Sequence, residues 1–311
     1  MFHLSLFRVG ILAVLAIQVS FAPRAQAQKR AACTFSFFKI DFPNPLDPPN
    51  PMVLIPEGIN DFGTVVGSTT KNTAFIRWSN GGLTFPNGVI ELVNRNNQGM
   101  SAGYDRQHNT IILDRTILSS ISVSIGPTTY PTFGIGGINT HGTIVGAIST
   151  DPKSVALHGL KRYFGGQGII LDFPGKRISR TFAAAINDSG TIVGTVDGSV
   201  PNHAGVEHGF ITFGGKWAAV DFPHAAGTKA PDTMLVGITN SGVIVGDAFL
   251  NPSNEFSTAF LYKNGVFEVI APPHMVGPRV TGISLKLGLI VGWGFPPQGL
   301  HPQRGFIAKC N

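Results

Sequence analysis

The sequence predicts an all-β protein, a six-bladed β-propeller of four-stranded blades that is closed by pairing of an N-terminal strand with the C-terminal blade. Three observations predict this fold. A phrase of nine or ten residues recurs along the chain. Its copies are spaced by about 45 residues, a period typical of propeller blades. Gly 39 and Pro 22 among 311 residues exclude a helical bundle, while 43% hydrophobic residues are enough for a sizeable core.

The recurring phrase has the form Ile-Asn-x-x-Gly, followed by a β-branched run and a closing glycine. Five copies keep most of this pattern, and one keeps only the spacing of its Asn and Gly residues. The copies are Ile59–Gly67, the degenerate Asn96–Gly103, Ile138–Gly146, Ile186–Gly194, Ile238–Gly246 and Ile283–Gly292. Six copies predict six blades. Because the second copy is degenerate, a five- or seven-bladed ring and a β-solenoid remain alternatives.

Each repeat divides into four expected strands, a to d. Strand a ends at the Ile-Asn pair, and strand b carries the β-branched run. Strand c is expected at Thr73–Ile76, His158–Leu160, His208–Ile211, Thr258–Leu261 and Arg304–Ile307. A tight turn with an Asn-Gly or Gly-Gly pair then leads to strand d, because these residues supply the positive φ angles of two-residue hairpins. Strand d ends at Asp-Phe-Pro, where the proline cannot donate a ladder hydrogen bond.

The last blade has no strand d of its own, because the chain ends at Asn311 soon after strand c at Gly305–Lys309. Near the other end, Phe37–Pro43 has the ending of a strand d with no strands a to c before it. We expect this segment to supply the missing strand, so that the first strand of the chain pairs with the last and closes the ring.

The two cysteines test this closure. By comparison with the third blade, Cys33 and Cys310 both fall where an intact blade turns from strand c to strand d. We predict a disulfide that replaces the missing turn and stabilises the fold by about 4–5 kcal/mol. A lipidated Cys33 is the competing interpretation. Arg30 argues against it, because lipidation requires an apolar residue three places before the cysteine.

Residues 1–27 have the pattern of a secretory signal peptide. Arg8 precedes an apolar run that ends near Ala22, and Ala25-Gln26-Ala27 has the small-x-small form of a cleavage site. The run is too short to span a bilayer as a helix, and no later stretch is long enough. We therefore expect residues 28–311 to form a single repeat domain outside the cytoplasm, secreted or periplasmic, with no membrane span after signal removal.

The recurring phrase, followed by a strand with a small residue before Phe, resembles the HAF repeats of bacterial extracellular proteins. The resemblance covers nearly the whole mature chain. The His-Ala-Phe triplet that names the family is replaced by Thr-Ala-Phe at Thr73 and Thr258 and by His-Gly-Phe at His208. The resemblance implies secretion and a β-propeller-like array. It implies no particular reaction, because the family is defined by its repeat.

No motif in the sequence predicts a catalytic residue, a cofactor or a metal site. Gly99–Gly103 matches the Gly-x-Ser-x-Gly of hydrolases around Ser101, but the same positions form a turn and a strand in other repeats. His158 and His208 occupy a strand-c position that also accepts Thr and Arg, which indicates hydrogen bonding within the blade. The aspartates that recur with the repeat, such as Asp61 and Asp188, are expected to bind backbone N–H groups in turns.

The connections between strands d and a, and between b and c, are long and variable, and they should share one face of the ring. Ligand-binding residues concentrate on loops of this kind. Four histidines fall there and form the candidate ligand face: His203, His224, His274 and His301. They lack the spacing of metal ligands, so loop histidines without a special role are favoured over a metal or pH-sensitive contact.

The leading functional hypothesis is a secreted, non-enzymatic scaffold that binds an extracellular carbohydrate, protein or surface component. The alternative is an extracellular glycan-active hydrolase or lyase, and a purely structural array is a third hypothesis. Scattered Lys and Arg residues, with a net charge of +6, do not favour nucleic acid as the partner. An enzyme should show convergent, non-repeating acids at the channel, whereas a binding module should show exposed aromatic side chains and no strongly perturbed carboxylates.

Overall fold

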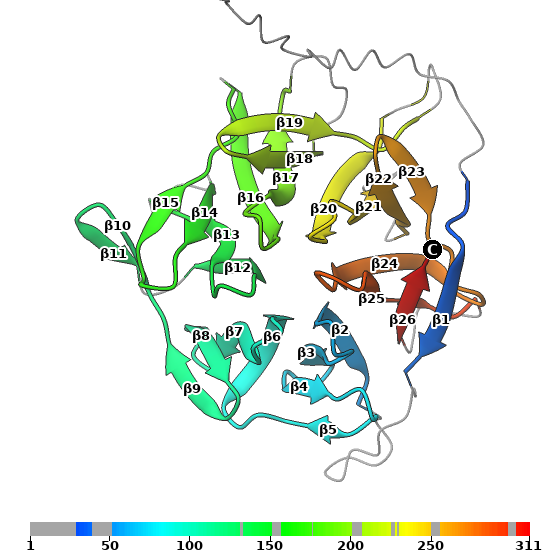
Figure 1. The fold of residues 1–311 in the computed structure, drawn as a ribbon, viewed down its shortest axis with the longest axis horizontal. Helices are drawn as coiled ribbons and strands as arrows, with labels where there is room; N and C mark the ends of the chain where they lie inside the picture. The colour runs from blue at the N-terminus through cyan, green and yellow to red at the C-terminus, as the bar shows by residue number, and fades with distance from the viewer. Residues whose placement is uncertain are drawn as a thin grey trace, which may run out of the picture.

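A computed structural model describes residues 29–38, 52–130, 133–150, 157–175, 177–200, 207–224, 228, 230–249, 256–297 and 303–311. Six antiparallel four-stranded sheets are arranged as blades around a central axis, with one strand of each blade innermost (Figure 1). The predicted six-bladed propeller is confirmed.

The blades follow one another along the chain, and the strands of each are named in order from the innermost strand a to the outermost strand d. Blade 1 has β2 (Leu54–Ile59), β3 (Val65–Thr69), β4 (Ala74–Arg77) and β5 (Leu83–Thr84). Blade 2 has β6 (Val89–Arg95), β7 (Met100–Asp105), β8 (Thr110–Asp114) and β9 (Ile117–Ser120). Blade 3 has β12 (Gly134–Ile138), β13 (Ile144–Ile148), β14 (His158–Arg162) and β15 (Gly168–Ile170).

Blade 4 has β16 (Ile178–Ile186), β17 (Ile192–Gly198), β18 (Glu207–Phe213) and β19 (Lys216–Val220). Blade 5 has β20 (Asp232–Ile238), β21 (Ile244–Phe249), β22 (Thr258–Lys263) and β23 (Val266–Val269). Blade 6 has β24 (Val276–Ile283), β25 (Leu289–Phe295) and β26 (Arg304–Cys310), with β1 (Cys33–Phe37) as its outermost strand.

The ring closes as predicted, because β1 pairs antiparallel with β26 across the two ends of the chain (Figure 1). Their register places Cys33 opposite Cys310, and the two form a disulfide. At the other end of the pair, the Phe38 N–H donates to the Gly305 carbonyl at 2.9 Å. The rest of the predicted strand, residues 39–43, lies outside the described residues.

One element was not predicted. A two-stranded hairpin of β10 (Val123–Ile125) and β11 (Thr128–Tyr130) lies between blades 2 and 3. It is anchored to blade 3, where the Ser124 N–H donates to the Gly166 carbonyl and the Arg162 guanidinium donates to the Ser122 carbonyl. The hairpin lies between two copies of the repeat and contains no part of the recurring phrase. The spacing of the copies therefore gave no signal for it.

The closing glycine of the repeat is required by close packing inside each blade. In blade 5, a Cβ added to Gly246 would lie 2.2 Å from the Met234 carbonyl oxygen and 2.6 Å from the Phe260 ring. Phe260 is the strand-c neighbour of Gly246 and is fully buried. The same arrangement recurs with Phe75, Phe210 and Phe306 in blades 1, 4 and 6. The strand-c phenylalanines are therefore core residues, as predicted.

These closing glycines pair with buried residues of strand a and form what we call the glycine layer. Its pairs are Pro56–Gly67, Leu92–Gly103, Ile135–Gly146, Ala183–Gly194, Leu235–Gly246 and Val280–Gly292. Directly after this pair, each strand a has a register shift that leaves one residue bulged. The bulged residues are Glu57, Val93, Gly136, Ala184, Val236 and Thr281.

We expect Gly246→Ala to lower the free energy of unfolding by about 1–3 kcal/mol, the usual cost of overpacking a core. The new methyl group meets backbone on one side, which cannot move away without distorting β20. Urea denaturation measures the loss. Gly165→Ala is the matched control, because a Cβ at Gly165 meets nothing within 4 Å. Equal stability of the two variants would contradict the packing role of the closing glycine.

Some predictions fall outside the described residues. These include the signal peptide at residues 1–27, Asp41 and much of the long connections at residues 44–51, 201–206, 251–255 and 298–302. Among the residues that are described, no helix has the length and hydrophobicity needed to span a membrane.

Candidate functional site

The two faces of the ring differ in how they are built. We call the face with the a–b and c–d turns the turn face, and the face with the d–a and b–c connections the loop face. On the turn face, the asparagine of the repeat links neighbouring blades. The Asn139 amide, for example, accepts the N–H groups of its own turn at His141 and Thr143 and donates to the Asn187 carbonyl of the next blade.

This link recurs around the channel. Side-chain amides donate from Asn60 to the Asn96 carbonyl, from Asn96 to Asn139 and from Asn187 to Thr239, at 3.0–3.3 Å. A backbone bond from Asn240 to Leu285 joins blades 5 and 6. The recurring Asn is therefore a structural residue, because its donor and its acceptor are both used to hold the ring together.

The repeated aspartates take part in the same ring of hydrogen bonds between neighbouring blades. Asp61 accepts the N–H groups of Lys286 and Leu287 from blade 6, and Asp188 accepts the Thr140 N–H from blade 3. Partial burial disfavours both carboxylates, but these hydrogen bonds outweigh it and lower the pKa of each. The prediction that they bind backbone N–H groups is confirmed, although the donors come from neighbouring blades and not from their own turns.

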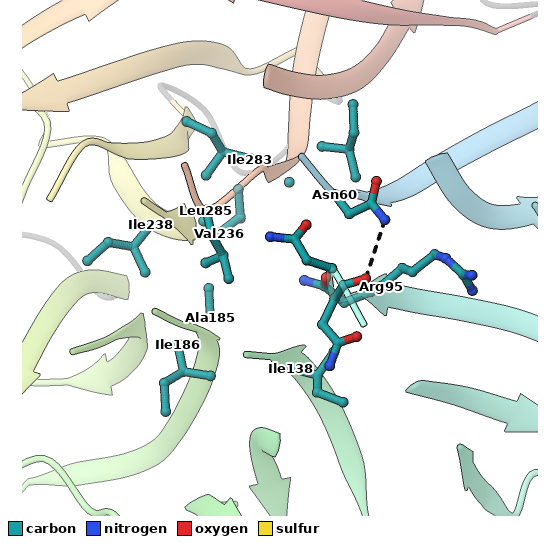
Figure 2. A pocket seen from close by; sticks show the side chains of 15 residues that line it. Asn60, Arg95, Ile138, Ala185, Ile186, Val236, Ile238, Ile283 and Leu285 are labelled. Atoms are coloured by element: carbon teal, nitrogen blue, oxygen red, sulfur yellow. Dashed lines mark hydrogen bonds between the residues drawn. The ribbon is translucent and has the colours of Figure 1, made fainter. Parts of the chain in front are cut away.

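A small, solvent-open hollow lies where the channel meets the turn face. Figure 2 shows apolar side chains around it, among them Ile138, Ile186, Ile238 and Ile283. Its polar lining consists of Arg95 and asparagine side chains, several of which donate the hydrogen bonds between blades described above. Among the described residues that line it, none is a carboxylate or a histidine.

The degenerate second repeat replaces an apolar pair with a polar one. Where other blades place isoleucine or valine on strands a and b, blade 2 places Arg95 opposite Ser101. The Arg95 guanidinium donates to Ser101 Oγ at 2.8 Å and lies 5.4 Å from the Trp78 ring centroid. Ser101 lies within β7, fully buried and hydrogen-bonded, so it lacks the strand–turn–helix setting of a hydrolase nucleophile.

Residues whose type differs from blade to blade lie one residue pair from the glycine layer, on the side of the loop face. We call these cross-strand pairs the variable layer: Ile55–Ser68, Glu91–Tyr104, Gly134–Ala147, Phe182–Thr195, Met234–Asp247 and Arg279–Trp293. In every blade, the strand-a residues of the variable layer and of the bulge are partly exposed, whereas the glycine-layer residue between them is buried. This alternation indicates that variable-layer and bulge residues line the central channel.

Charged side chains lie on this wall in the consecutive blades 6, 1 and 2. They are Arg279, the bulged Glu57 and Glu91. Burial raises the pKa of Glu57 to about 8, with a further increase from the charge of Glu91 and a smaller opposing effect from Arg279. Burial also raises the pKa of Glu91, and the charge of His108 opposes it. Glu57 is therefore mostly protonated at neutral pH.

Arg279 connects this group to blade 5. Its Nε lies 3.8 Å from Oδ2 of Asp247, whose carboxylate also accepts the Val280 N–H at 3.2 Å. Burial raises the pKa of Asp247 to about 7, although the charge of Arg279 and the Val280 hydrogen bond both lower it. We call Glu57, Glu91, Asp247 and Arg279 the channel cluster. It is the candidate functional site.

We expect the free energy of unfolding to fall as the pH rises from about 5 to about 8. Above pH ~4–5 an unfolded chain has released the protons of Glu57 and Asp247, whereas the folded chain retains them up to the raised pKa values. The folded state therefore binds more protons in this window, and rising pH favours unfolding by roughly 1 kcal/mol per pH unit for each group. Urea denaturation of the wild type and Glu57→Gln across this range measures the slope. In the variant, the slope of the unfolding free energy against pH should be smaller by the contribution of Glu57. An unchanged slope would contradict the raised pKa of Glu57.

The histidines of strand c have a structural role, as predicted. Nδ1 of His158 lies 2.8 Å from Oδ2 of Asp172, and Nδ1 of His208 lies 3.0 Å from Oδ2 of Asp221. Each pair ties strand c to the residues that follow strand d. Burial lowers the pKa of His208, but the hydrogen bond and charge of Asp221 outweigh this effect and raise it.

The predicted histidine face is only partly described. His224 lies between β19 and β20, and His274 lies between β23 and β24, so both belong to loop-face connections. His203 and His301 lie outside the described residues. In the described part of the chain, no group of three or more His, Cys, Asp or Glu side chains is placed to hold a metal.

Comparison with known proteins does not assign the chain to a family. No family model matches it. No curated protein matches it either. The resemblance to HAF repeats therefore stays a prediction.

Several solved structures resemble the chain at low identity. The β-propeller domain of the trilobed protease from Pyrococcus furiosus has 9% identity and a TM-score of 0.44, covering 80% of this chain and 78% of that one. An Aleuria aurantia lectin in complex with α-methyl-L-fucoside has 9% identity and a TM-score of 0.41, covering 79% and 88%. The Cps50 β-propeller domain from Myceliophteria thermophila has 9% identity and a TM-score of 0.42, covering 83% and 84%.

The channel cluster was not predicted from the sequence, although the sequence contains a signal for it. When the repeats are aligned on their closing glycines, two positions do not repeat: the residue after each glycine, and the residue four before the last residue of each strand a. Glu91, Asp247 and Arg279 fall at these places. Glu57 could not be found in this way, because its exposure to the channel depends on the bulge.

Proposed function

We propose that the chain is a non-enzymatic repeat protein that acts outside the cytoplasm, in the periplasm or after secretion. In this proposal it binds an extracellular carbohydrate, protein or surface component at the loop-face end of its channel. The signal-like segment at residues 1–27 and the disulfide between Cys33 and Cys310 support the location, because disulfides persist in oxidising compartments.

One observation carries the proposed binding role: the channel cluster does not repeat. Blades 3 and 4 place Gly134 and Phe182 where blades 2 and 6 place Glu91 and Arg279, and they form the same four strands. The fold therefore does not require the charges. Partly buried ionisable groups cost free energy when they lack full compensation. A set of such groups on the wall of a rigid channel is best explained by contact with a ligand.

The criteria that separate a binding module from an enzyme give a divided answer. Exposed aromatic side chains are present on both faces. Phe62 and Phe164 on the turn face are 66% and 72% exposed, and Phe256 on a loop-face connection is 42% exposed. Perturbed carboxylates are also present, in Glu57 and Asp247. We favour binding because the described residues that line the hollow at the turn face include no carboxylate, so this hollow lacks the paired acids of a glycan-active cleft.

A binding screen against immobilised glycans and extracellular proteins tests this function. We expect the purified wild type to retain a ligand, and Arg279→Met on the channel wall to lose it while keeping the same unfolding midpoint. The matched control is Phe62→Ser on the turn face, which should bind like the wild type. If Phe62→Ser alone lost the ligand, the site would lie on the turn face and the proposal would be wrong.

Glu57 favours one second candidate, a glycan-active hydrolase or lyase. A carboxyl group that keeps its proton at neutral pH can act as a general acid, and Glu91 supplies a second carboxylate on the next blade. Incubation with polysaccharides should then release new reducing ends or unsaturated sugars, and Glu57→Gln should abolish the release. Absence of product from every polysaccharide that the protein binds would exclude this candidate.

A further inference from the structure

Arg279 is held by aromatic rings in a way that leaves its hydrogen-bond donors available. Its guanidinium carbon lies 5.0 Å from the ring centroid of Phe249 in blade 5 and 5.6 Å from that of Trp293 in its own blade. Such contacts stabilise the cation through the faces of the rings and fix the plane of the guanidinium. Within the described residues, no hydrogen bond uses a side-chain N–H group of Arg279. Its side chain is 34% exposed, so a ligand can reach it.

The positive charge of Arg279 is only partly compensated. The 3.8 Å between its Nε and Oδ2 of Asp247 is longer than a hydrogen bond. Because burial raises the pKa of Asp247 to about 7, this carboxyl group is not fully ionised at neutral pH. Glu57 is mostly protonated there as well. The wall therefore presents a cation at neutral pH although Glu57 and Asp247 lie beside it.

The neighbours of Arg279 restrict the kind of anion that fits. A ligand with several negative charges, such as a phosphorylated polymer, would meet one cation, Arg279, and two carboxyl groups, Glu57 and Glu91, so its further charges would lack cationic partners on this wall. A carboxyl group with a raised pKa can donate as well as accept hydrogen bonds, which suits hydroxyl groups. Trp293 and the 42% exposed Phe256 are aromatic surfaces near the loop-face end of the wall. A single carboxylate on a hydroxylated ring meets all three conditions.

We propose that Arg279 is the anion-recognition residue of the channel and that the ligand is an acidic saccharide, whose carboxylate pairs with the guanidinium while its hydroxyl groups bind Glu57 and Glu91. This inference rests on the proposed binding function and adds the chemical class of the ligand. The planar fork of arginine matches the two oxygens of a carboxylate, and a bidentate pair of this kind is stronger than a neutral hydrogen bond.

The proposal predicts that binding weakens as the pH rises. The titratable groups that face Arg279 and Glu57 are Glu91 of β6 and Asp247 of β21, and His108 faces Glu91. Deprotonation of Glu57 and Asp247 adds negative charge beside the bound carboxylate. Affinity should therefore be highest near pH 6 and fall through about pH 7–8, and Glu57→Gln should reduce this dependence.

The test uses saccharides that carry uronic or sialic acid, each paired with the same saccharide methyl-esterified at its carboxylate. Purified full-length protein is screened on this panel, and the tightest pair is titrated by calorimetry at pH 6 and pH 8.5. We expect binding of the free acids alone. Arg279→Gln should weaken it about tenfold or more, as loss of a charge-assisted hydrogen bond implies. Arg279→Lys should retain part of the affinity, because it keeps the charge but loses the fork.

Controls separate recognition from folding. Arg180→Gln removes another partly exposed arginine, which pairs with Asp197 at 3.1 Å in blade 4, and it should bind like the wild type. Arg279→Met introduces a methionine, the residue at the equivalent position of blade 5, Met234. This variant therefore provides the test if Arg279→Gln fails to fold.

Three other outcomes would overturn the inference, and one of them would also overturn the proposed function. Equal binding of acid and ester, or wild-type affinity in the Arg279 variants, overturns the inference and leaves the binding function standing. Retention of acidic peptides in place of saccharides overturns the saccharide assignment. Absence of any retained saccharide, peptide or protein overturns both the inference and the proposed function.

Discussion

We expect replacement of both Cys33 and Cys310 by serine to lower the free energy of unfolding by about 4–5 kcal/mol. The disulfide joins residues separated by 277 positions, so it closes nearly the whole chain into one loop. Without it, β1 is held to β26 only by the ladder of five residue pairs from Cys33 to Phe37 and by neighbouring contacts. Because β1 is the strand that brings the N-terminal end of the described chain back to blade 6, loss of this strand opens the ring.

Urea denaturation of the double variant beside the wild type measures this effect. The wild type treated with a thiol reductant serves as a second comparison, since it should unfold at the same urea concentration as the variant. Digestion by a protease under native conditions should first cut near β1 in the variant. A double variant as stable as the oxidised wild type would show that the strand pairing alone closes the ring.

We expect Phe260→Ala to lower the free energy of unfolding by about 3–5 kcal/mol, as truncation of a buried phenylalanine does in other cores. Phe260 is fully buried, covers Gly246 and lies with its ring centroid 5.2 Å from those of both Phe222 and Phe267. Truncation leaves a cavity that these two rings border. The glycine opposite has no side chain with which to fill it.

Phe62→Ala is the matched control, because Phe62 lies in an a–b turn and is 66% exposed. We expect its effect to stay within about 0.5 kcal/mol, as for most surface substitutions. Thermal and urea unfolding of both variants provide the comparison. If the two lost similar stability, the strand-c phenylalanines would not be the centre of the four blades that contain them.

The fold was predictable because the features that build it repeat. The Asn, the turn glycine, the closing glycine and the strand-c phenylalanine each solve one packing problem that recurs from blade to blade. Ring closure was also predictable, since a blade without its outer strand and a strand without a blade stand at opposite ends of the chain. Cys33 and Cys310 then gave an independent check of the register, which the structure confirms.

The candidate site was harder to predict from the sequence, because its residues do not repeat. A repeat pattern emphasises what is common to the blades, whereas binding chemistry lies in what differs between them. Glu57 reaches the channel through a backbone bulge that has no residue signature of its own. The histidines were chosen for their loops, and of the four only His224 and His274 fall within described residues. Arg95 and Ser101 explain why the second repeat looks degenerate: a hydrogen-bonded pair replaces an apolar one.

The central claim is that repeated residues build the ring while the channel cluster binds the ligand. The most direct test is the ligand affinity of one triple variant, Glu57→Val, Glu91→Ile and Arg279→Met. Each new residue already occupies the same position in another blade, at Val93, Ile55 and Met234. We expect this variant to remain folded, because its new residues already pack at the same positions in other blades and because Asp247, whose pKa burial already raises, can stay protonated without Arg279. We expect it to lose ligand binding completely. A folded triple variant that binds with wild-type affinity would contradict the claim.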